Sequence, residues 1–329
     1  MKQFSYVRVT SGKAAISELS KDKTAMFLAG GTNLVDLMKS GVTNPERLVD
    51  ITRVPLATIE ATKTGLRIGA LAKNTAVAEH PLVLKHFPLL SQALNAGASP
   101  QLRNMATVGG NMMQRTRCHY FYDTALPCNK RNPGSGCGAI GGFSRMHAIF
   151  GASDKCIAVH PSDMCVALTA LDAVITVTGA KGERKISFGE FHRLPGDTPE
   201  IDNTLQRGEL ITAVDIPFND ALQQTHYLKV RDRASYAFAL VSAGVALSLK
   251  GNNIADVRIA MGGVAHKPWR LKEAEAYLKG KPATEEHFRE AARLTMAQAK
   301  AEEGNAYKLT LAPNTIVEAL KLAAANGNI

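Results

Sequence analysis

The sequence predicts an α+β protein made of three successive parts. The first observation is a strand–helix–strand pattern in residues 1–58, joined by a glycine-rich turn. The second is a mixed strand and helix pattern over residues 59–222, interrupted by a cysteine-rich stretch. The third is a run of strands followed by helices in residues 223–329, an order typical of a compact α+β domain.

Residues 1–58 are predicted to form a small α/β unit. Phe4–Val9 and Ala25–Ala29 have strand patterns, and a helix is predicted between them over Gly12–Leu19. The second strand passes through a diglycine turn into an amphipathic helix from Leu34, and Leu48–Ile51 follows as a buried strand. Strand, turn, helix and strand in this order predict parallel pairing, because parallel neighbours need a crossover connection.

Residues 59–222 mix strands and helices around the cysteines. Leu66–Ala70 alternates apolar and polar residues, which is the period of a strand. Thr75 caps or precedes a helical run, and a longer helix is predicted over Leu89–Ala96. Strands resume after the cysteines with Ala173–Val177 and Leu210–Ile216.

Residues 223–329 are predicted to form an antiparallel sheet with helices. Three strands in succession are expected over His226–Val230, Phe238–Leu249 and Ile254–Gly262. Two helices follow near Glu285–Ala301 and Ile316–Ala325. The absence of a repeat or low-complexity linker in the sequence indicates that the three parts pack tightly.

Composition narrows the function classes. The chain of 329 residues has a net charge of +10, but its basic residues are scattered and it has one Trp, so we expect no nucleic-acid binding. A basic face that docks on acidic protein subunits explains the charge better. We expect no membrane insertion, because no apolar run could span a bilayer. The N-terminal residues lack a secretory signal, so the chain by itself predicts a cytoplasmic location.

Two diglycine turns indicate a dinucleotide site. The segment Leu28–Leu34 lies where a strand passes into a helix, and its glycines let backbone N–H groups approach an anion closely. The segment Thr107–Asn111 repeats this chemistry with a hydroxyl, paired glycines and an amide. Either turn alone could be an ordinary tight turn, whereas two together favour binding of a pyrophosphate. The G-x-G-x-x-G at Gly136, Gly138 and Gly141 has no strand before it and is interpreted as coincidence.

Four of the five cysteines lie in one segment. Cys118, Cys128, Cys137 and Cys156 are too far apart for zinc-ribbon or ferredoxin spacing, but four thiolates can bind Zn²⁺ or an iron–sulfur cube. Loose cysteines in a glycine-rich loop are the alternative. Cys165 follows in an apolar run and is interpreted as a buried core thiol.

Basic residues outnumber acidic ones around these cysteines. Such cations would stabilise a negatively charged cluster, although they could equally form a solvated face. His119, His147 and His266 are interpreted as structural, but His119 is adjacent to Cys118 and could support a ligand there.

The motifs A-G-G-T-N-L, R-N-x-x-T-x-G-G-N, H-P-S-D, L-K-V-R-D-R-A-S-Y-A-F-A-L and G-G-V-A-H-K-P-W occur in this order along nearly the whole chain. The set resembles the FAD-binding subunits of molybdenum hydroxylases, the family of xanthine dehydrogenase and carbon monoxide dehydrogenase flavoproteins. Within it, the likeness is closest to subunits of periplasmic aldehyde oxidoreductases, which carry a 4Fe-4S cluster on an insertion. The resemblance implies a two-subdomain FAD-binding fold of the vanillyl-alcohol-oxidase type. The subdomains would be 1–58 and 59–222, with the insertion at about 115–158. A carbon monoxide dehydrogenase flavoprotein-like domain would follow over 223–329.

The resemblance also implies residue roles. Asp163 would hydrogen-bond sugar or ribityl hydroxyls, Leu210 would pack near the flavin or adenine, and Lys229 would face the isoalloxazine. The two turns would wrap the pyrophosphate and adenosine side of FAD through Phe27, Leu28, Ala29, Gly30, Gly31, Thr32, Asn33, Leu34, Thr107, Gly109, Gly110 and Asn111. The 4Fe-4S cluster would be bound by Cys118, Cys128, Cys137 and Cys156.

The implied function is electron transfer within a heterotrimeric, molybdenum-dependent aldehyde oxidoreductase. A large molybdopterin-binding subunit would oxidise the aldehyde, and a small 2Fe-2S subunit would pass electrons to the FAD of this chain. An external acceptor would receive them, and no catalytic acid, base or nucleophile is expected here. The resemblance implies a periplasmic location by co-export with a signal-bearing partner. The alternatives are a self-sufficient flavin oxidase or reductase and a zinc-stabilised structural subunit.

Overall fold

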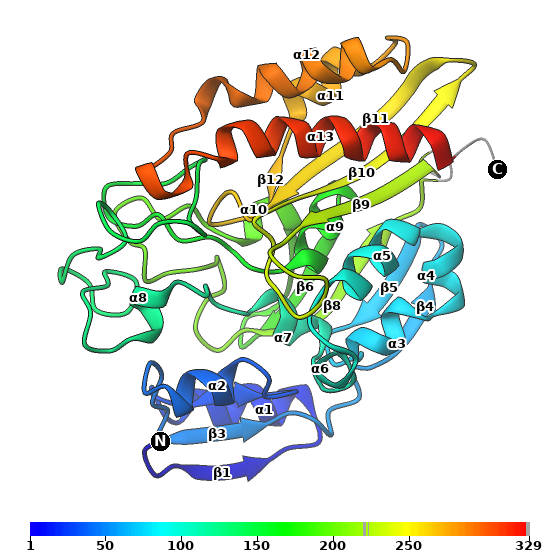
Figure 1. The fold of residues 1–329 in the computed structure, drawn as a ribbon. Coiled ribbons are helices and arrows are strands. Elements are labelled where there is room, and N and C mark those ends of the chain that lie inside the picture. The colour runs from blue at the N-terminus through cyan, green and yellow to red at the C-terminus, as the bar shows by residue number, and fades with distance from the viewer. Residues whose placement is uncertain (220–221, 223, 327–329) are drawn as a thin grey trace.

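The computed structural model describes residues 1–219, 222 and 224–326. It contains three sheets, each built from one of the three predicted parts, and it confirms the α+β class. In Figure 1 these parts follow one another from the blue N-terminal unit through the cyan and green middle to the yellow and red C-terminal domain. The predicted boundary lies between residues 222 and 223, and residue 223 is outside the described residues.

The N-terminal sheet is parallel, as predicted. Its order is β1-β3-β2, from β1 (Ser5–Arg8), β3 (Arg47–Asp50) and β2 (Met26–Leu28). Helix α1 (Gly12–Ser20) begins after Ser11, whose hydroxyl accepts the N–H of Ala14 and so satisfies one free donor of the first turn. Helix α2 (Leu34–Lys39) follows the first diglycine turn. A small apolar core, including Val9, Ala15 and Val49, lies between α1 and the sheet.

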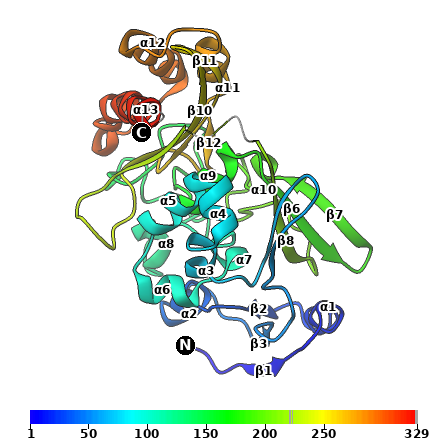
Figure 2. The ribbon, with the colours of Figure 1, turned by 90° about the vertical axis from the view of Figure 1, so that its right-hand side faces the viewer.

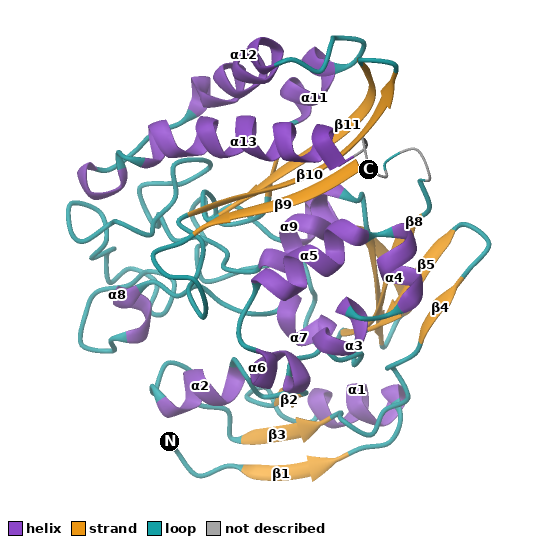
Figure 3. Cartoon of the chain, turned by 45° about the vertical axis from the view of Figure 1, so that its right-hand side comes forward, coloured by secondary structure: helices purple, strands orange, loops and turns teal. Residues whose placement is uncertain are grey.

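The middle part holds an antiparallel sheet of order β4-β5-β8-β6-β7. The strands are β4 (Ile59–Ala61), β5 (Gly65–Gly69), β6 (Val174–Gly179), β7 (Gly182–Ser187) and β8 (Leu210–Pro217). The helices are α3 (Asn74–Ala78), α4 (Pro81–His86), α5 (Pro88–Ala96), α6 (Pro100–Met105), α7 (Val108–Met112), α8 (His119–Tyr122), α9 (Asp163–Ala170) and α10 (Phe188–Phe191). Figure 3 shows α5 and α9 lying between this sheet and the C-terminal one.

Helix α9 is buried on every side, and this explains why most of its residues form an apolar run. All eight of its residues are buried, including Cys165, which is a core thiol as interpreted from the sequence. Ser162 caps the helix by accepting the N–H of Cys165. Asp163 is therefore the first residue of a helix, and its side chain is held at a fixed point.

The C-terminal sheet is antiparallel, with the order β12-β11-β10-β9. Its strands are β9 (Gln224–Val230), β10 (Val241–Lys250), β11 (Asn253–Gly262) and β12 (Trp269–Arg270). Its helices are α11 (Lys272–Leu278), α12 (Glu285–Thr295) and α13 (Lys308–Ala325), with short 3-10 turns η1 (Met296–Gln298) and η2 (Glu303–Asn305). Figure 2 shows the helices gathered on one side of the sheet. Helix α13 begins at Lys308, eight residues before the start predicted at Ile316. The helix continues through Pro313, whereas a proline usually interrupts a helix.

The cysteine segment, residues 115–158, forms a loop-rich lobe whose one regular helix is α8, at the left of Figure 1. Polar contacts from a buried lysine and a partly buried arginine help to hold it in place. Lys130 is buried, and its Nζ donates to the carbonyl of Pro199 at 2.6 Å and to Asp202 at 2.5 Å. Arg115 donates to the other oxygen of Asp202 at 2.6 Å. Burial alone would raise the pKa of Asp202, but these two cations hold it below its usual value.

A second buried lysine ties this segment to the C-terminal domain. Lys308 of α13 has no exposed surface, and its Nζ donates to the carbonyls of His147 at 2.9 Å and Gly263 at 2.7 Å. Burial lowers its pKa to about 7.

Among the described residues, no helix is both long and apolar enough to cross a bilayer.

Replacing Lys308 with methionine is expected to change how stability depends on pH. An exposed lysine titrates at about 10.4, so above the folded-state value the unfolded chain binds more protons. The stability of the natural chain should therefore rise with pH relative to K308M, by on the order of 2 kcal/mol between about pH 7 and about pH 9. Urea unfolding across this window measures the difference, with K250M at an exposed strand end as the control. A gap between natural chain and K308M that stays constant with pH would contradict the prediction.

Candidate flavin and cysteine sites

The first diglycine turn lies directly against the middle part of the chain. A Cβ added to Gly30 would be 2.1 Å from the carbonyl oxygen of Met105, so only glycine allows this contact. Gly31 has a φ of +75°, in the left-handed region that glycine occupies without strain. Within the described part of the chain, the N–H groups of Gly31 and Thr32 have no hydrogen-bond acceptor, and the buried Nδ2 atom of the half-buried Asn33 has none either. The turn therefore presents unused donors.

The second diglycine turn uses its donors internally. Thr107 caps α7, and its hydroxyl accepts the N–H of Gly110 at 3.2 Å. The N–H of Gly109 donates to Ala70 at 2.8 Å, and that of Asn111 donates to the carbonyl of Thr107 at 2.8 Å. This differs from the expectation of two equivalent anion-binding turns. Thr107 and Gly109 hold the second turn in shape, while Gly110 and Asn111 face a cavity.

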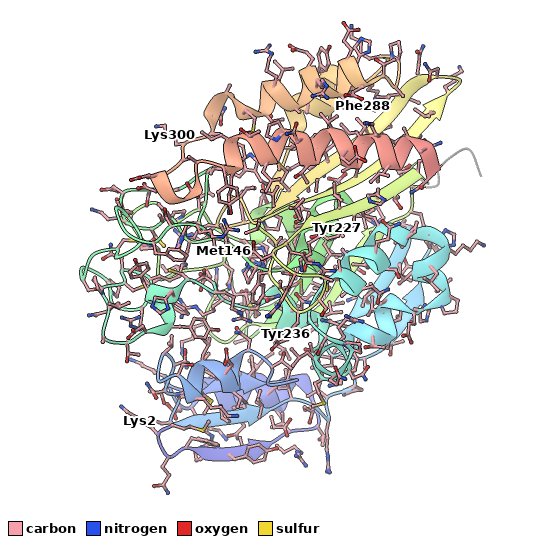
Figure 4. The ribbon with its side chains drawn as sticks, viewed as in Figure 1. Lys2, Met146, Tyr227, Tyr236, Phe288 and Lys300 are labelled. Atoms are coloured by element: carbon pink, nitrogen blue, oxygen red, sulfur yellow. The ribbon has the colours of Figure 1, made fainter. Side chains whose placement is uncertain are left out.

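A cavity of about 720 Å³ lies between the three parts of the chain. Its size is within the range of about 300–1,000 Å³ that is usual for small-molecule sites. Figure 4 marks this central region by Tyr227 and Tyr236 from the C-terminal part and Met146 from the cysteine segment. The predicted residues that line the cavity are Thr32, Gly110, Asn111, Asp163 and Lys229.

A buried carboxylate stands at one wall of this cavity. The Oδ1 of Asp163 accepts the hydroxyl of Tyr227 at 2.7 Å, and its Oδ2 accepts Nζ of Lys229 at 2.8 Å. Lys229 also donates to the carbonyl of Ala96 at 3.0 Å. Burial, and then the charge of Asp163, raise the pKa of Tyr227 well above its usual value. The tyrosine is therefore a neutral donor, and the Lys229–Asp163 pair is fixed from both sides.

Leu210 lies apart from this group. It is the first residue of β8 and lines a second cavity of about 440 Å³, together with Gly12 and Ile16 of α1. Phe27 and Leu28 lie in β2, and Ala29 and Leu34 flank the first turn. The structure thus brings five of the predicted residues to the large cavity and places Leu210 at another.

Several cavity residues were not predicted from the sequence. Arg103, Arg117 and Phe238 line the large cavity, as do Tyr122 and Tyr236. Tyr236 has a φ of 51°, unusual for a residue with a side chain. The quoted motifs contain three of these residues, since R-N-x-x-T begins at Arg103 and S-Y-A-F spans Tyr236 and Phe238. The motifs therefore contained a sequence signal for these three cavity residues, Arg103, Tyr236 and Phe238.

The four predicted cysteines of the segment converge. Cys118, Cys128, Cys137 and Cys156 line one small cavity, and none is in a disulfide. Cys128 and Cys137 are paired in an isolated antiparallel bridge, which brings two of the four cysteines together. Burial raises the pKa of Cys118 to about 11 and that of Cys156 to about 12. These thiols would release protons on binding a metal.

The surroundings of the cysteines suit a negatively charged centre. The charge of Lys130 favours the thiolate of Cys156, and backbone N–H groups of Tyr120 and Phe121 favour that of Cys118. The Nε2 of His147 lies 3.1 Å from the Sγ of Cys118. His119, singled out from the sequence, is instead exposed beside Tyr120.

A further buried group contains His160, Cys165 and His192, whose donor atoms lie within 4.8 Å of one another. Burial lowers the pKa of His160 well below its usual value, and the charges of Lys130 and Arg117 act in the same direction. The same positive field opposes a divalent cation. We therefore interpret this group as part of the core.

Comparison with known proteins gives matches along almost the whole chain. Residues 2–219 match the family described as the FAD binding domain in molybdopterin dehydrogenase, and residues 226–323 match the carbon monoxide dehydrogenase flavoprotein C-terminal domain. The chain is 49% identical to the aldehyde oxidoreductase FAD-binding subunit of Escherichia coli (strain K12), over 99% of both chains. It is 30% identical to the glyceraldehyde dehydrogenase medium chain of Sulfolobus acidocaldarius, over 90% of this chain and 88% of that one.

The fold matches solved structures as well. A carbon monoxide dehydrogenase chain from Hydrogenophaga pseudoflava has a TM-score of 0.78 and 26% identity, with 98% of each chain covered. A chain of quinoline 2-oxidoreductase from Pseudomonas putida 86 has a TM-score of 0.77 and 25% identity, with both chains fully covered. The fold predicted from the family resemblance is confirmed.

Asp163→Asn is expected to destabilise the chain by about 3 kcal/mol, because it leaves a buried lysine without its carboxylate. Urea unfolding monitored by circular dichroism measures the loss. The matched control is Glu290→Gln, which breaks an exposed ion pair with Arg293 and should have a much smaller effect on stability. Equal losses of unfolding free energy in the two variants would show that the buried Lys229–Asp163 pair contributes no more to stability than an exposed ion pair.

Proposed function

This chain belongs to the FAD-binding subunits of the molybdenum hydroxylase family, and we propose that it is the electron-transfer flavoprotein subunit of a molybdenum-dependent aldehyde oxidoreductase. The observation that carries the proposal is the pair of adjoining sites, a dinucleotide-sized cavity and a converged set of four cysteines. The full-length likeness to an aldehyde oxidoreductase subunit supports the substrate class.

The large cavity fits FAD. The free N–H groups of Gly31 and Thr32, with the unpaired amide of Asn33, suit a pyrophosphate at the first turn. When bound, FAD supplies a redox centre that takes up and releases electrons. Lys229 and Asp163 would lie beside it as a fixed ion pair, and the Lys229 cation would favour the reduced, anionic form. Leu210, expected near the flavin or adenine, lines a separate cavity, so the FAD site proposed here does not include it.

The four cysteines fit a 4Fe-4S cluster. Four thiolates around one point, a nearby lysine and backbone N–H donors are the arrangement that stabilises a negatively charged cube. Zn²⁺ accepts the same four ligands, so metal analysis separates the cluster from a zinc-stabilised structural subunit.

The proposed partners are supported by the relatives of this chain, which are named as a subunit or a medium chain. A large molybdopterin-binding subunit would oxidise the aldehyde, and a small 2Fe-2S subunit would deliver electrons to the cavity described here. The net charge of +10 suits docking on acidic subunits. An external acceptor would complete the turnover, and we propose a periplasmic complex exported with a signal-bearing partner.

An absorption spectrum of the purified chain, read with iron and zinc analysis, tests this function. Flavin bands with a broad iron–sulfur shoulder, together with no flavin reduction when aldehyde is added to this subunit alone, support it. Reduction by aldehyde in the isolated subunit would favour a self-sufficient oxidase or reductase. A colourless protein containing zinc would favour the structural alternative, and cell fractionation tests the location.

Gly30→Ala is expected to lower the flavin content of the purified chain at least tenfold. The new methyl group would collide with the Met105 carbonyl and push the first turn away from the cavity. The measurement is the ratio of flavin to protein absorbance. Gly189→Ala, where an added Cβ meets no atom within 4 Å, should keep its flavin. Full flavin content in G30A would contradict the assignment of this turn.

Cys156→Ser is expected to abolish stable iron binding, whereas Cys165→Ala should leave it intact. Cys156 faces the shared cysteine cavity, and Cys165 is enclosed in α9. Iron and acid-labile sulfide analysis measures the effect, with about four irons per chain expected in the natural protein. Iron loss in C165A with retention in C156S would reverse the assignment of the ligands.

A further inference from the structure

The cysteine segment contains two histidines in very different positions. His119 follows Cys118 directly in sequence, yet its side chain is exposed. His147 is buried, and its Nε2 lies 3.1 Å from the sulfur of Cys118, which is hydrogen-bonding distance for a sulfur acceptor. The Nδ1 of His147 has no partner among the described residues. The contact that its Nε2 makes at this distance is therefore with the sulfur of Cys118, one of the four proposed cluster ligands.

The backbone of His147 is held by the C-terminal domain. The Nδ2 of Asn305 donates to the carbonyls of His147 and Ala148, both at 3.1 Å. Nζ of the buried Lys308 donates to the same His147 carbonyl at 2.9 Å. Two buried donors from outside the segment thus fix the point from which the imidazole reaches Cys118. The position of the ring does not depend on the loop alone.

The contact lies on the side of the cysteines that faces the flavin cavity. A small cavity of about 120 Å³ is lined by Cys118 and His147 and also by Arg117, Met146 and Asp163. The last three residues line the large cavity as well. Among the residues that the structure describes around this passage, Cys118 is the one cysteine of the four. A hydrogen-bond donor to the Cys118 sulfur therefore acts at the point where the cysteine cavity adjoins the large cavity.

We propose that His147 is a positioning residue that donates a hydrogen bond from Nε2 to the Cys118 sulfur and raises the reduction potential of the cluster. The inference rests on the 4Fe-4S cluster proposed above. A hydrogen bond to a sulfur ligand withdraws negative charge and so stabilises the reduced state, which carries one more electron. Through this bond the C-terminal domain influences how one electron is shared between cluster and flavin.

The test compares His147→Leu and His147→Gln with the natural protein, each with flavin and iron loaded. The cluster potential is measured by a redox titration followed by electron paramagnetic resonance. H147L should shift to a more negative potential by about 59 mV or more, a tenfold change in the reduced-to-oxidised ratio of a one-electron couple. H147Q keeps an N–H donor and should lie between H147L and the natural protein. His119→Leu removes an imidazole beside the same ligand and should leave the potential unchanged.

A second measurement does not depend on these variants retaining iron. Pulsed resonance of the reduced cluster, in protein with isotope-labelled histidine, should show a weak nitrogen coupling that persists in H119L. Absence of this coupling, or an unshifted potential in iron-replete H147L, would overturn the role of His147. Loss of iron in both His147 variants would also overturn it, since the residue would then hold the cluster. If the natural protein contains no iron, the cluster in the proposed function fails instead.

Discussion

The proposed flavin site depends on the contact between the backbone of Gly30 and the backbone of Met105 and Ala106. An oxygen only 2.1 Å from the place of a missing Cβ means that the N-terminal unit and the middle part meet with no side chain between them. This contact sets the first turn at the mouth of a cavity whose other walls come from the middle and C-terminal parts. The N-terminal sheet has only a small apolar core, and this contact sets its position relative to the middle part of the chain.

Buried cations provide the second set of constraints. Three lysines are almost fully enclosed, and each donates to a backbone carbonyl from another segment, so burial of the charge is offset by hydrogen bonds. They join the sheet of the C-terminal domain to α5, the cysteine segment to the loop before β8, and α13 to the cysteine segment. The lysines and their carbonyl partners are Lys229 with Ala96, Lys130 with Pro199, and Lys308 with His147. Part of the positive charge of the chain is thus internal and structural.

The cysteine segment contacts both the N-terminal unit and the C-terminal domain. Helix α2 of the N-terminal unit packs on it through Leu37 and Phe121, while Asn305 and Lys308 hold it from the opposite side. The backbone hydrogen bonds within this lobe are mostly short-range turn bonds, so these contacts with other parts of the chain help to fix its position. A bound cluster would add a further one.

The sequence by itself determined the α+β class, the parallel N-terminal unit and the two glycine turns, because strand periods and paired glycines act locally. It also identified the four cysteines as one set, since their crowding in one segment is visible without coordinates. Only the tertiary structure showed that the second turn spends its N–H groups on Ala70 and Thr107, and that α13 runs through Pro313. It likewise placed His147, and not the adjacent His119, against Cys118, because that contact is made by packing across 29 residues of sequence.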